Sequence, residues 1–252
     1  MSPAALRVAV LFPDLLGTYG DGGNGLILSQ RASWRGLDAE LLQAVSDAPV
    51  PEADIYCLGG GEDGPQVRAA RTLIDDGTLG RRVAGGAVVL AVCAGFQVVG
   101  RSFPGADGEA HEGVGLLDIE TVKGAGPRAV GEVVAEPVGL EGLAAASAFP
   151  ALTGFENHGG VTALGEGTAP LGRVTAGVGN GDGSEGALQG RVVGTYLHGP
   201  VLARNPALAD LLLSWALGDP GLAPLDDRAA ESLREERLGV ARRRRGLHRL
   251  RR

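Results

Sequence analysis

Several residue types are scarce in this chain of 252 residues. Lysine occurs once, at Lys123, aromatic residues make up 4%, and the only cysteines are Cys57 and Cys93. The shortage of lysine beside 43 glycines is typical of G+C-rich coding rather than of a function. The two cysteines lie in separate strand-like runs, and in a reducing compartment we expect both to be free thiols.

Patterns for activating a substrate with ATP or a metal are also missing. The sequence contains no Walker A motif and no amino-acid ligase pattern, so the chain cannot itself activate a carboxylate with ATP. His111 and Glu112 are too isolated in a Gly-rich loop to bind zinc. We therefore predict no metal and no cofactor in this chain.

Uninterrupted apolar segments are short. The N-terminal run "VAVLF" is too short for a secretory signal, so we predict a cytoplasmic protein. Residues 83–100 carry no charge and nearly reach the length of a membrane span. Because the run "AVVLAV" follows two glycines and Gln97 interrupts the second half, we predict instead a strand buried in a parallel sheet.

Strand-like and helical segments alternate in the first half of the chain, which predicts a doubly wound α/β fold. A small antiparallel extension, or a hairpin, is expected from the shorter runs that follow a Gly- and acid-rich loop. The expected strands are residues 7–13, 54–60, 88–93 and 191–199; the helices 24–35, 65–76 (with Pro65 at its first position), 94–101, 206–217 and 227–238; the loop 103–113; and the extension 114–122 and 131–137.

Cys93 and His198 are the candidate catalytic pair. Cys93 ends a predicted strand and is followed by two small residues, which suits a sharp turn at a helix N-terminus that favours a thiolate. His198 ends another strand-like run and reaches the same sheet edge, although a surface histidine that caps a turn is the alternative. Cys57, within its strand, is interpreted as an ordinary buried cysteine.

A glycine-rich loop, "CLGGGEDGPQ", follows the strand that contains Cys57. Its unobstructed backbone N–H groups could bind a phosphate or an oxyanion. Phosphate is disfavoured because Glu62 and Asp63 would repel it and the lysine of a P-loop is missing. We therefore predict an oxyanion site.

Six ordered segments resemble class I glutamine amidotransferases of the cobyric acid synthase (CobB/CobQ) type over residues 7–217. Within that group, the first and fifth segments look most like the glutaminase (GatD) subunits of lipid II isoglutaminyl synthases. The segments are "LFPDLLGTYGDGGN", "LGGGEDGPQ", "AVCAGFQVVG", "GVGLLDIET", "GFENHGG" and "GTYLHGP". The resemblance implies a flavodoxin-like amidotransferase domain at residues 1–220, followed by a C-terminal helix (221–240) and a basic tail (241–252).

The resemblance also implies the role of each site residue. Glutamine would be hydrolysed by Cys93 as nucleophile and His198 as acid and base. The other implied residues are Ala94, Gly60 and Gly61 for the oxyanion, Arg128 for the α-carboxylate of glutamine, and Gln97 near the substrate. For Arg128 a plain surface position, and for Gln97 a role only in orienting the turn, stay open.

Many class I amidotransferases carry a glutamate two residues after the histidine, where this chain has Pro200. The CobB/CobQ type shares this difference. We therefore expect the carboxylate that orients His198 to come from elsewhere in this chain, with Glu156 as a candidate, or, preferably, from a partner subunit.

The resemblance implies a MurT-like, Mur-ligase-related partner in a heterodimer. That subunit would bind ATP and Mg²⁺ and amidate the D-glutamate of lipid II, in peptidoglycan synthesis. Cobyrinate or another acceptor is the alternative, and a catalytically dead binding module is disfavoured because Cys93, His198 and the glycine loop are all retained.

The segment "ARRRRGLHRLRR" (241–252) holds 7 of the 23 basic residues and leaves the remainder of the chain with 16 basic against 30 acidic residues. We predict a disordered tail. The acidic body opposes nucleic-acid binding, so peripheral contact with an anionic membrane is the functional alternative to a solvated end.

Overall fold

The computed structural model describes residues 5–138, 140 and 149–249. A central sheet of six strands has the order β13-β14-β4-β3-β1-β2, and all of its pairs are parallel except β13 with β14. Its strands are β1 (Leu6–Leu11), β2 (Ala39–Ala44), β3 (Ile55–Leu58), β4 (Val88–Val92), β13 (Ala187–Gln189) and β14 (Val192–Thr195). The predicted doubly wound α/β fold is confirmed.

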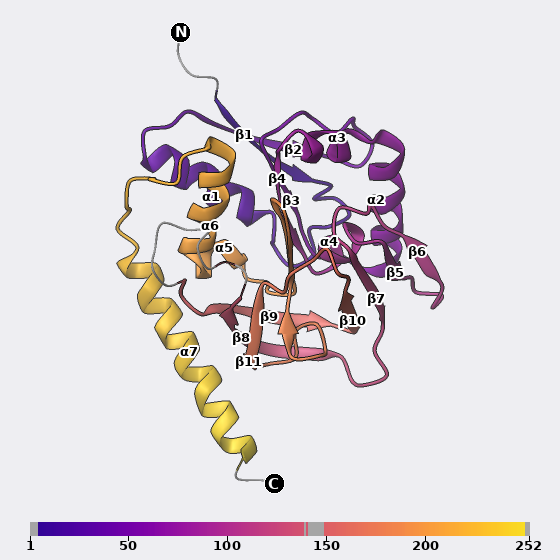
Figure 1. The fold of residues 1–252 in the computed structure, drawn as a ribbon, viewed down its shortest axis with the longest axis vertical. Helices are drawn as coiled ribbons and strands as arrows, with labels where there is room; N and C mark the ends of the chain where they lie inside the picture. Colours follow the sequence, from indigo (N-terminus) through magenta and orange to yellow (C-terminus); the bar gives the residue numbers. More distant parts are fainter. Residues whose placement is uncertain (1–4, 139, 141–148, 250–252) are drawn as a thin grey trace.

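Helices cover both faces of this sheet (Figure 1). The helices are α1 (Gly23–Trp34), α2 (Asp63–Asp76), α3 (Thr78–Ala84), α4 (Ala94–Val98), α5 (Val201–Arg204), α6 (Pro206–Leu217) and α7 (Arg228–Arg249). Helix α2 begins two residues before Pro65, because the first turn of a helix tolerates a proline that lacks an N–H. Helix α6 has the predicted bounds and ends at Gly218, which adopts φ 65°.

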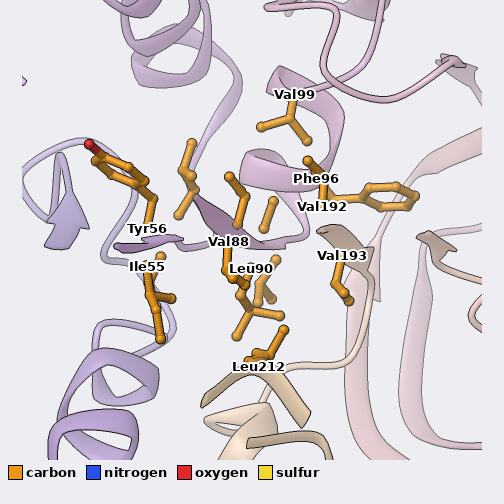
Figure 2. Close-up of a cluster of buried hydrophobic side chains, with 14 of the residues drawn as sticks. Ile55, Tyr56, Val88, Leu90, Phe96, Val99, Val192, Val193 and Leu212 are labelled. Atoms are coloured by element: carbon orange, nitrogen blue, oxygen red, sulfur yellow. The ribbon is translucent and has the colours of Figure 1, made fainter. Parts of the chain in front are cut away.

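The run that resembled a membrane span forms the centre of the core. All five residues of β4 are buried, as are all five of α4. Val88 and Leu90 lie next to Ile55 of β3, between Val99 at the end of α4 and Leu212 of α6 (Figure 2). Helices on both sides explain why β4 is apolar at every position. No helix in the described ranges is long and apolar enough to cross a membrane.

Two further sheets of four strands form the extension, with the orders β10-β7-β5-β6 and β12-β11-β8-β9. Their strands are β5 (Ser102–Pro104), β6 (Ala110–Glu112), β7 (Ile119–Lys123), β8 (Ala129–Pro137), β9 (Leu152–His158), β10 (Gly160–Leu164), β11 (Gly172–Ala176) and β12 (Ser184–Glu185). An antiparallel extension was predicted, but a hairpin of its first two runs is wrong. β7 pairs with β10 and β8 pairs with β9, so the two runs lie in different sheets.

The expected loop at residues 103–113 is also wrong in part, because β5 and β6 form a short antiparallel hairpin there. The C-terminal helix is longer than predicted.

Helix α7 continues through Arg249, so the prediction of a disordered tail is wrong for residues 241–249, and residues 250–252 lie outside the described ranges. Arg31 of α1 binds Asp210 of α6 and Asp227, which holds the start of α7 against the domain.

Candidate active site

Cys93 lies on the sharp turn between β4 and α4. Its backbone has φ 52° and ψ −106°, a conformation that is strained for a residue with a side chain. The turn needs the following glycine, because a Cβ on Gly95 would lie 2.7 Å from Cβ of Leu58 and 3.0 Å from the carbonyl oxygen of Gly59. The structure thus has the sharp strand-to-helix turn predicted for a nucleophile.

Cys57 occupies the middle of β3 and has no such setting. Burial raises the pKa of its thiol to about 12, so the thiol stays protonated and inert. The sequence interpretation of Cys57 as a buried structural cysteine is confirmed.

His198 follows β14 and is held by its own backbone. Its N–H donates to the carbonyl oxygen of Phe155 (2.8 Å) and its carbonyl oxygen accepts from the N–H of Phe155 (3.1 Å). The side chain is buried, and the ring of Tyr19 lies 4.6 Å away between centroids. The alternative of a surface histidine is therefore wrong.

Asp21 orients the imidazole. Its Oδ2 lies 2.8 Å from Nδ1 of His198, and its side chain is fully buried. Because a carboxylate only accepts, Nδ1 carries a proton, and Nε2 has no other hydrogen-bond partner in the described part of the chain. The carboxylate thus comes from elsewhere in this chain, as one of the two alternatives expected, but it belongs to Asp21 and not to Glu156 or to the preferred partner subunit.

Two effects on the pKa of His198 oppose each other. Burial favours the neutral imidazole, whereas the hydrogen bond to Asp21 and the neighbouring sulfur of Cys93, as a thiolate, favour the charged form. The charged form wins and the pKa of His198 rises to about 9. Near neutral pH the ring is therefore protonated and able to donate a proton from Nε2.

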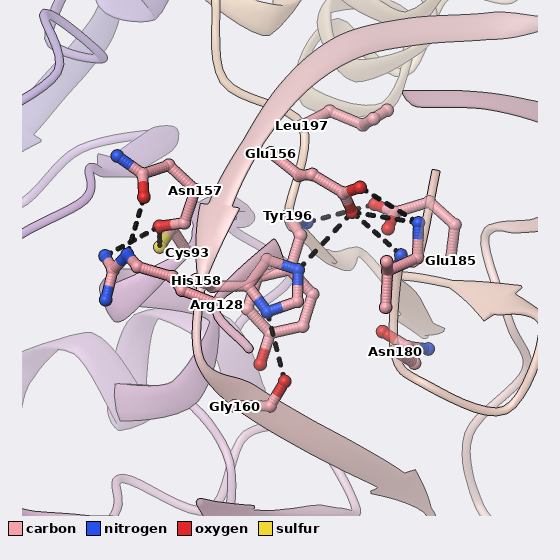
Figure 3. A network of polar contacts seen from close by, with 12 residues as sticks. Cys93, Arg128, Glu156, Asn157, His158, Gly160, Asn180, Glu185, Tyr196 and Leu197 are labelled. Carbon is pink, nitrogen blue, oxygen red and sulfur yellow. Dashed lines mark hydrogen bonds and ion pairs between the residues drawn. The ribbon is translucent and has the colours of Figure 1, made fainter. Parts of the chain in front are cut away.

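Glu156 has a different task. Its carboxylate accepts hydrogen bonds from the N–H groups of Val178 and Gly179, and it lies 3.5 Å from Nε2 of His158 (Figure 3). His158 in turn stacks on Tyr196, with ring centroids 3.7 Å apart. These contacts make Glu156 a support for His158, which lines the pocket described below.

The glycine loop after β3 meets Asp21 as well as the pocket. The N–H of Gly60 donates to Oδ2 of Asp21 at 3.0 Å, so in this structure that N–H is already engaged and its oxyanion role stays a prediction. Gly61 and Ala94 do line the pocket. As the first residue of α4, Ala94 has no acceptor within its helix for its N–H.

A pocket of about 250 Å³ opens beside Cys93. It lies between the amino ends of α2 and α4, the end of β7 and the turn between β9 and β10. Its lining residues are Gly61, Asp63, Gln66, Cys93, Ala94, Gln97, Pro104, Gly105, Lys123, Gly124, Gly126, Arg128, His158, Gly159 and Gly160.

Arg128 is fixed on the wall of this pocket by Asn157. Its Nε donates to Oδ1 of Asn157 at 2.6 Å, and its Nη2 donates to the carbonyl oxygen of the same residue at 2.9 Å (Figure 3). That carbonyl oxygen is also 4.0 Å from Sγ of Cys93. The N–H groups of Nη1 and the second N–H of Nη2 remain to bind a carboxylate in two places.

Gln97 lines the pocket, but both the nitrogen and the oxygen of its side-chain amide are hydrogen-bonded within the protein. Its Nε2 donates to the hydroxyl of Tyr196 at 3.1 Å, and its Oε1 accepts from Nε2 of Gln66 at 2.8 Å. Gln66 also donates to the carbonyl oxygen of Ala94 at 3.4 Å. These bonds favour the role of Gln97 in supporting the turn at Cys93.

Three residues near the site, Asp21, Asn157 and Lys123, were not among those predicted from the sequence. Asp21 and Asn157 lie inside two of the segments that carried the family resemblance, which was the available signal. Lys123 ends β7 at the pocket. No group of three or more His, Cys, Asp or Glu side chains that could hold a metal occurs in the ranges that the structure covers.

The fold and this site define a class of enzyme. A profile of the CobB/CobQ-like glutamine amidotransferase domain matches residues 7–206, and the chain belongs to this family. Two solved glutamine amidotransferases have the same fold: one at 21% identity, with a TM-score of 0.54 over 83% of this chain and 98% of its own, and one from Thermotoga maritima at 18%, with a TM-score of 0.55 over 94% and 95%.

Particular relatives are more similar in sequence. The chain is 35% identical over 222 residues to the lipid II isoglutaminyl synthase (glutamine-hydrolyzing) subunit GatD of Staphylococcus aureus, covering 86% of each chain. It is 32% identical over 244 residues to the GatD subunit of Streptococcus pneumoniae, covering 93% of this chain and 91% of that one. A cobyric acid synthase of Pelotomaculum thermopropionicum is 37% identical over 153 residues, but only 28% of its length is covered.

Proposed function

We propose that this chain is a glutaminase subunit that hydrolyses L-glutamine and delivers the ammonia to a MurT-like, ATP-dependent ligase, which amidates the D-glutamate of lipid II. The observation that carries the glutaminase step is the Cys93, His198 and Asp21 arrangement beside a pocket that also contains Arg128. The acceptor and partner are supported by the two GatD relatives, which this chain matches over most of their length.

In the first half of the reaction, the Cys93 thiolate attacks the carboxamide carbon and forms a carbon–sulfur bond. The carbonyl oxygen becomes an oxyanion, for which the N–H groups of Ala94 and Gly61 are the candidate donors. The carbon–nitrogen bond then breaks, and the proton on Nε2 of His198 passes to the leaving nitrogen, so ammonia and a thioester result.

In the second half, the neutral Nε2 of His198 accepts a proton from water as that water attacks the thioester. Breaking the carbon–sulfur bond releases glutamate and restores the thiolate and the imidazolium. Throughout, Asp21 holds Nδ1, so that Nε2 faces the reaction. No cofactor is needed in this chain, and ATP and Mg²⁺ would belong to the partner.

Replacement of the nucleophile tests the glutaminase step. Cys93→Ala should reduce ammonia release from glutamine to background while the circular dichroism spectrum stays unchanged, because only the thiol is lost. The matched control is Cys57→Ala, which removes the other thiol, although some stability is lost at this buried site. More than trace glutaminase activity in Cys93→Ala would contradict the proposal.

A purified complex tests the acceptor. With ATP and lipid II, the complex of this chain with a Mur-ligase-like subunit should amidate lipid II from glutamine. The Cys93→Ala complex should do so only from ammonium chloride. Amidation of cobyrinate instead of lipid II would assign the chain to the alternative acceptor.

The basic C-terminal segment supports a second, weaker association. Seven arginines in residues 241–252 would each gain about 1 kcal/mol near an anionic bilayer, so we include reversible contact with the membrane face that holds lipid II. Co-sedimentation with vesicles that contain phosphatidylglycerol should be lost when residues 241–252 are deleted, and should weaken with salt. Equal binding by the truncated chain would exclude this role.

A further inference from the structure

Charged side chains on the pocket wall are of two kinds. Lys123 and Arg128 are cationic, and Asp63 is the one acidic side chain on the wall among the described residues. Asp63 is exposed and makes no ion pair or side-chain hydrogen bond within the ranges that the structure covers. Its carboxylate is therefore available to a molecule in the pocket.

The proposed substrate leaves one group without a partner. The carboxamide of glutamine faces Cys93, and its α-carboxylate matches the N–H groups of Arg128 that Asn157 does not use. The α-ammonium still requires an acceptor, since a charged group that loses water without compensation weakens binding. Two cations alone on the wall would favour a dianion over the zwitterionic end of an amino acid.

We propose that Asp63 binds the α-ammonium of glutamine and makes the pocket selective for an α-amino acid. The inference rests on the proposed glutaminase function and extends it to a specificity-determining residue. Asp63 begins α2, whereas Lys123 ends β7 and Arg128 precedes β8, so the charges reach the pocket from separate elements. In this proposal, glutamine bound between these elements places its α-ammonium at Asp63 and its α-carboxylate at Arg128.

A structural role for Asp63 has to be distinguished from binding. An acidic residue in the first turn of α2 also interacts favourably with the helix dipole. Glu62 provides the matched control, because it is the N-cap residue of the same helix, is exposed, and is absent from the pocket wall. If the acids act only through the dipole of α2, replacing either Glu62 or Asp63 should change the activity in the same way. If Asp63 contacts the substrate, only its replacement should change the activity.

The experiment compares two substrates. Glutaramate has the carboxamide and the carboxylate of glutamine but no α-ammonium. In the unaltered chain, kcat/KM should be higher for L-glutamine than for glutaramate by roughly 10- to 100-fold, as expected for a hydrogen bond between charged groups. In Asp63→Asn this preference should largely disappear. The decrease in kcat/KM for glutamine should come mainly from a higher KM, and kcat/KM for glutaramate should stay unchanged.

Each outcome decides a separate point. Glu62→Gln should leave both substrates unaffected. If Asp63→Asn keeps the preference for glutamine, or lowers both substrates equally, Asp63 does not bind the α-ammonium. If the unaltered chain releases no ammonia from either compound, the glutaminase function itself fails, and this inference fails with it.

Discussion

Nδ1 of His198 lies 2.8 Å from Oδ2 of Asp21, although the two residues are 177 positions apart in the chain. The same oxygen accepts the N–H of Gly60, so one carboxylate fixes both the imidazole and the glycine loop. This contact supplies within the chain the orienting acid that is missing two residues after His198.

Asp21→Asn should lower kcat for glutamine by about 10²-fold or more, because an amide that donates toward Nδ1 favours the wrong tautomer of His198. Steady-state ammonia release measures the effect. Glu156→Gln is the comparison, since Glu156 binds backbone N–H groups of residues 178 and 179 and not His198. A larger loss of kcat in Glu156→Gln than in Asp21→Asn would contradict the role of Asp21.

The ionisation of His198 gives a prediction on pH. Its pKa in the folded chain is about 9, above the value of about 6.5 for an unperturbed histidine. The stability that this charge contributes is therefore complete below about pH 6.5 and is lost as the pH rises through about 9. Histidine NMR titration should show a midpoint near 9, and Asp21→Asn should lower it, because burial then opposes the charge with less compensation. An unchanged midpoint in the variant would exclude Asp21 as the cause.

The purified chain should hydrolyse glutamine without a partner, because Cys93, His198 and Asp21 all belong to it. Adding the synthetase subunit should change kcat by less than the roughly 10²-fold expected if the orienting acid came from the partner. This replaces the expectation from the sequence that a partner subunit supplies the orienting acid. A rise of 10²-fold or more on complex formation would return the orienting role to the partner.

Arg128→Lys should raise KM for glutamine by about 10-fold or more with a smaller change in kcat, since lysine cannot bind Asn157 and a carboxylate at two points together. The measurement is a series of initial rates over glutamine concentration. Arg173→Lys, on β11 and outside the pocket wall, is the control of the same chemistry. Equal KM values for the two variants would show that Arg128 is a surface arginine.

The sequence by itself determined the layered α/β core and the position of the nucleophile. Apolar runs such as "VVLAV" can be predicted as buried strands, because burial on both faces of a sheet requires apolar side chains at every position. The small residues after Cys93 predict the sharp turn for a similar local reason, because the turn leaves no room for a Cβ on Gly95. Helix α6 was predicted at its observed bounds, and its end residues Pro206 and Gly218 are local signals because each acts within a single turn.

Only the tertiary structure decided which strands pair in the extension and which acid faces His198. β8 pairs with β9 rather than with β7, and this depends on side chains from the whole sheet rather than on either strand alone. Glu156 was as plausible as Asp21 from residue type, yet the fold turns Glu156 toward the N–H groups of residues 178 and 179. The physical reason is that a carboxylate takes its role from the donors within about 3 Å of it, and long-range contacts decide which donors those are.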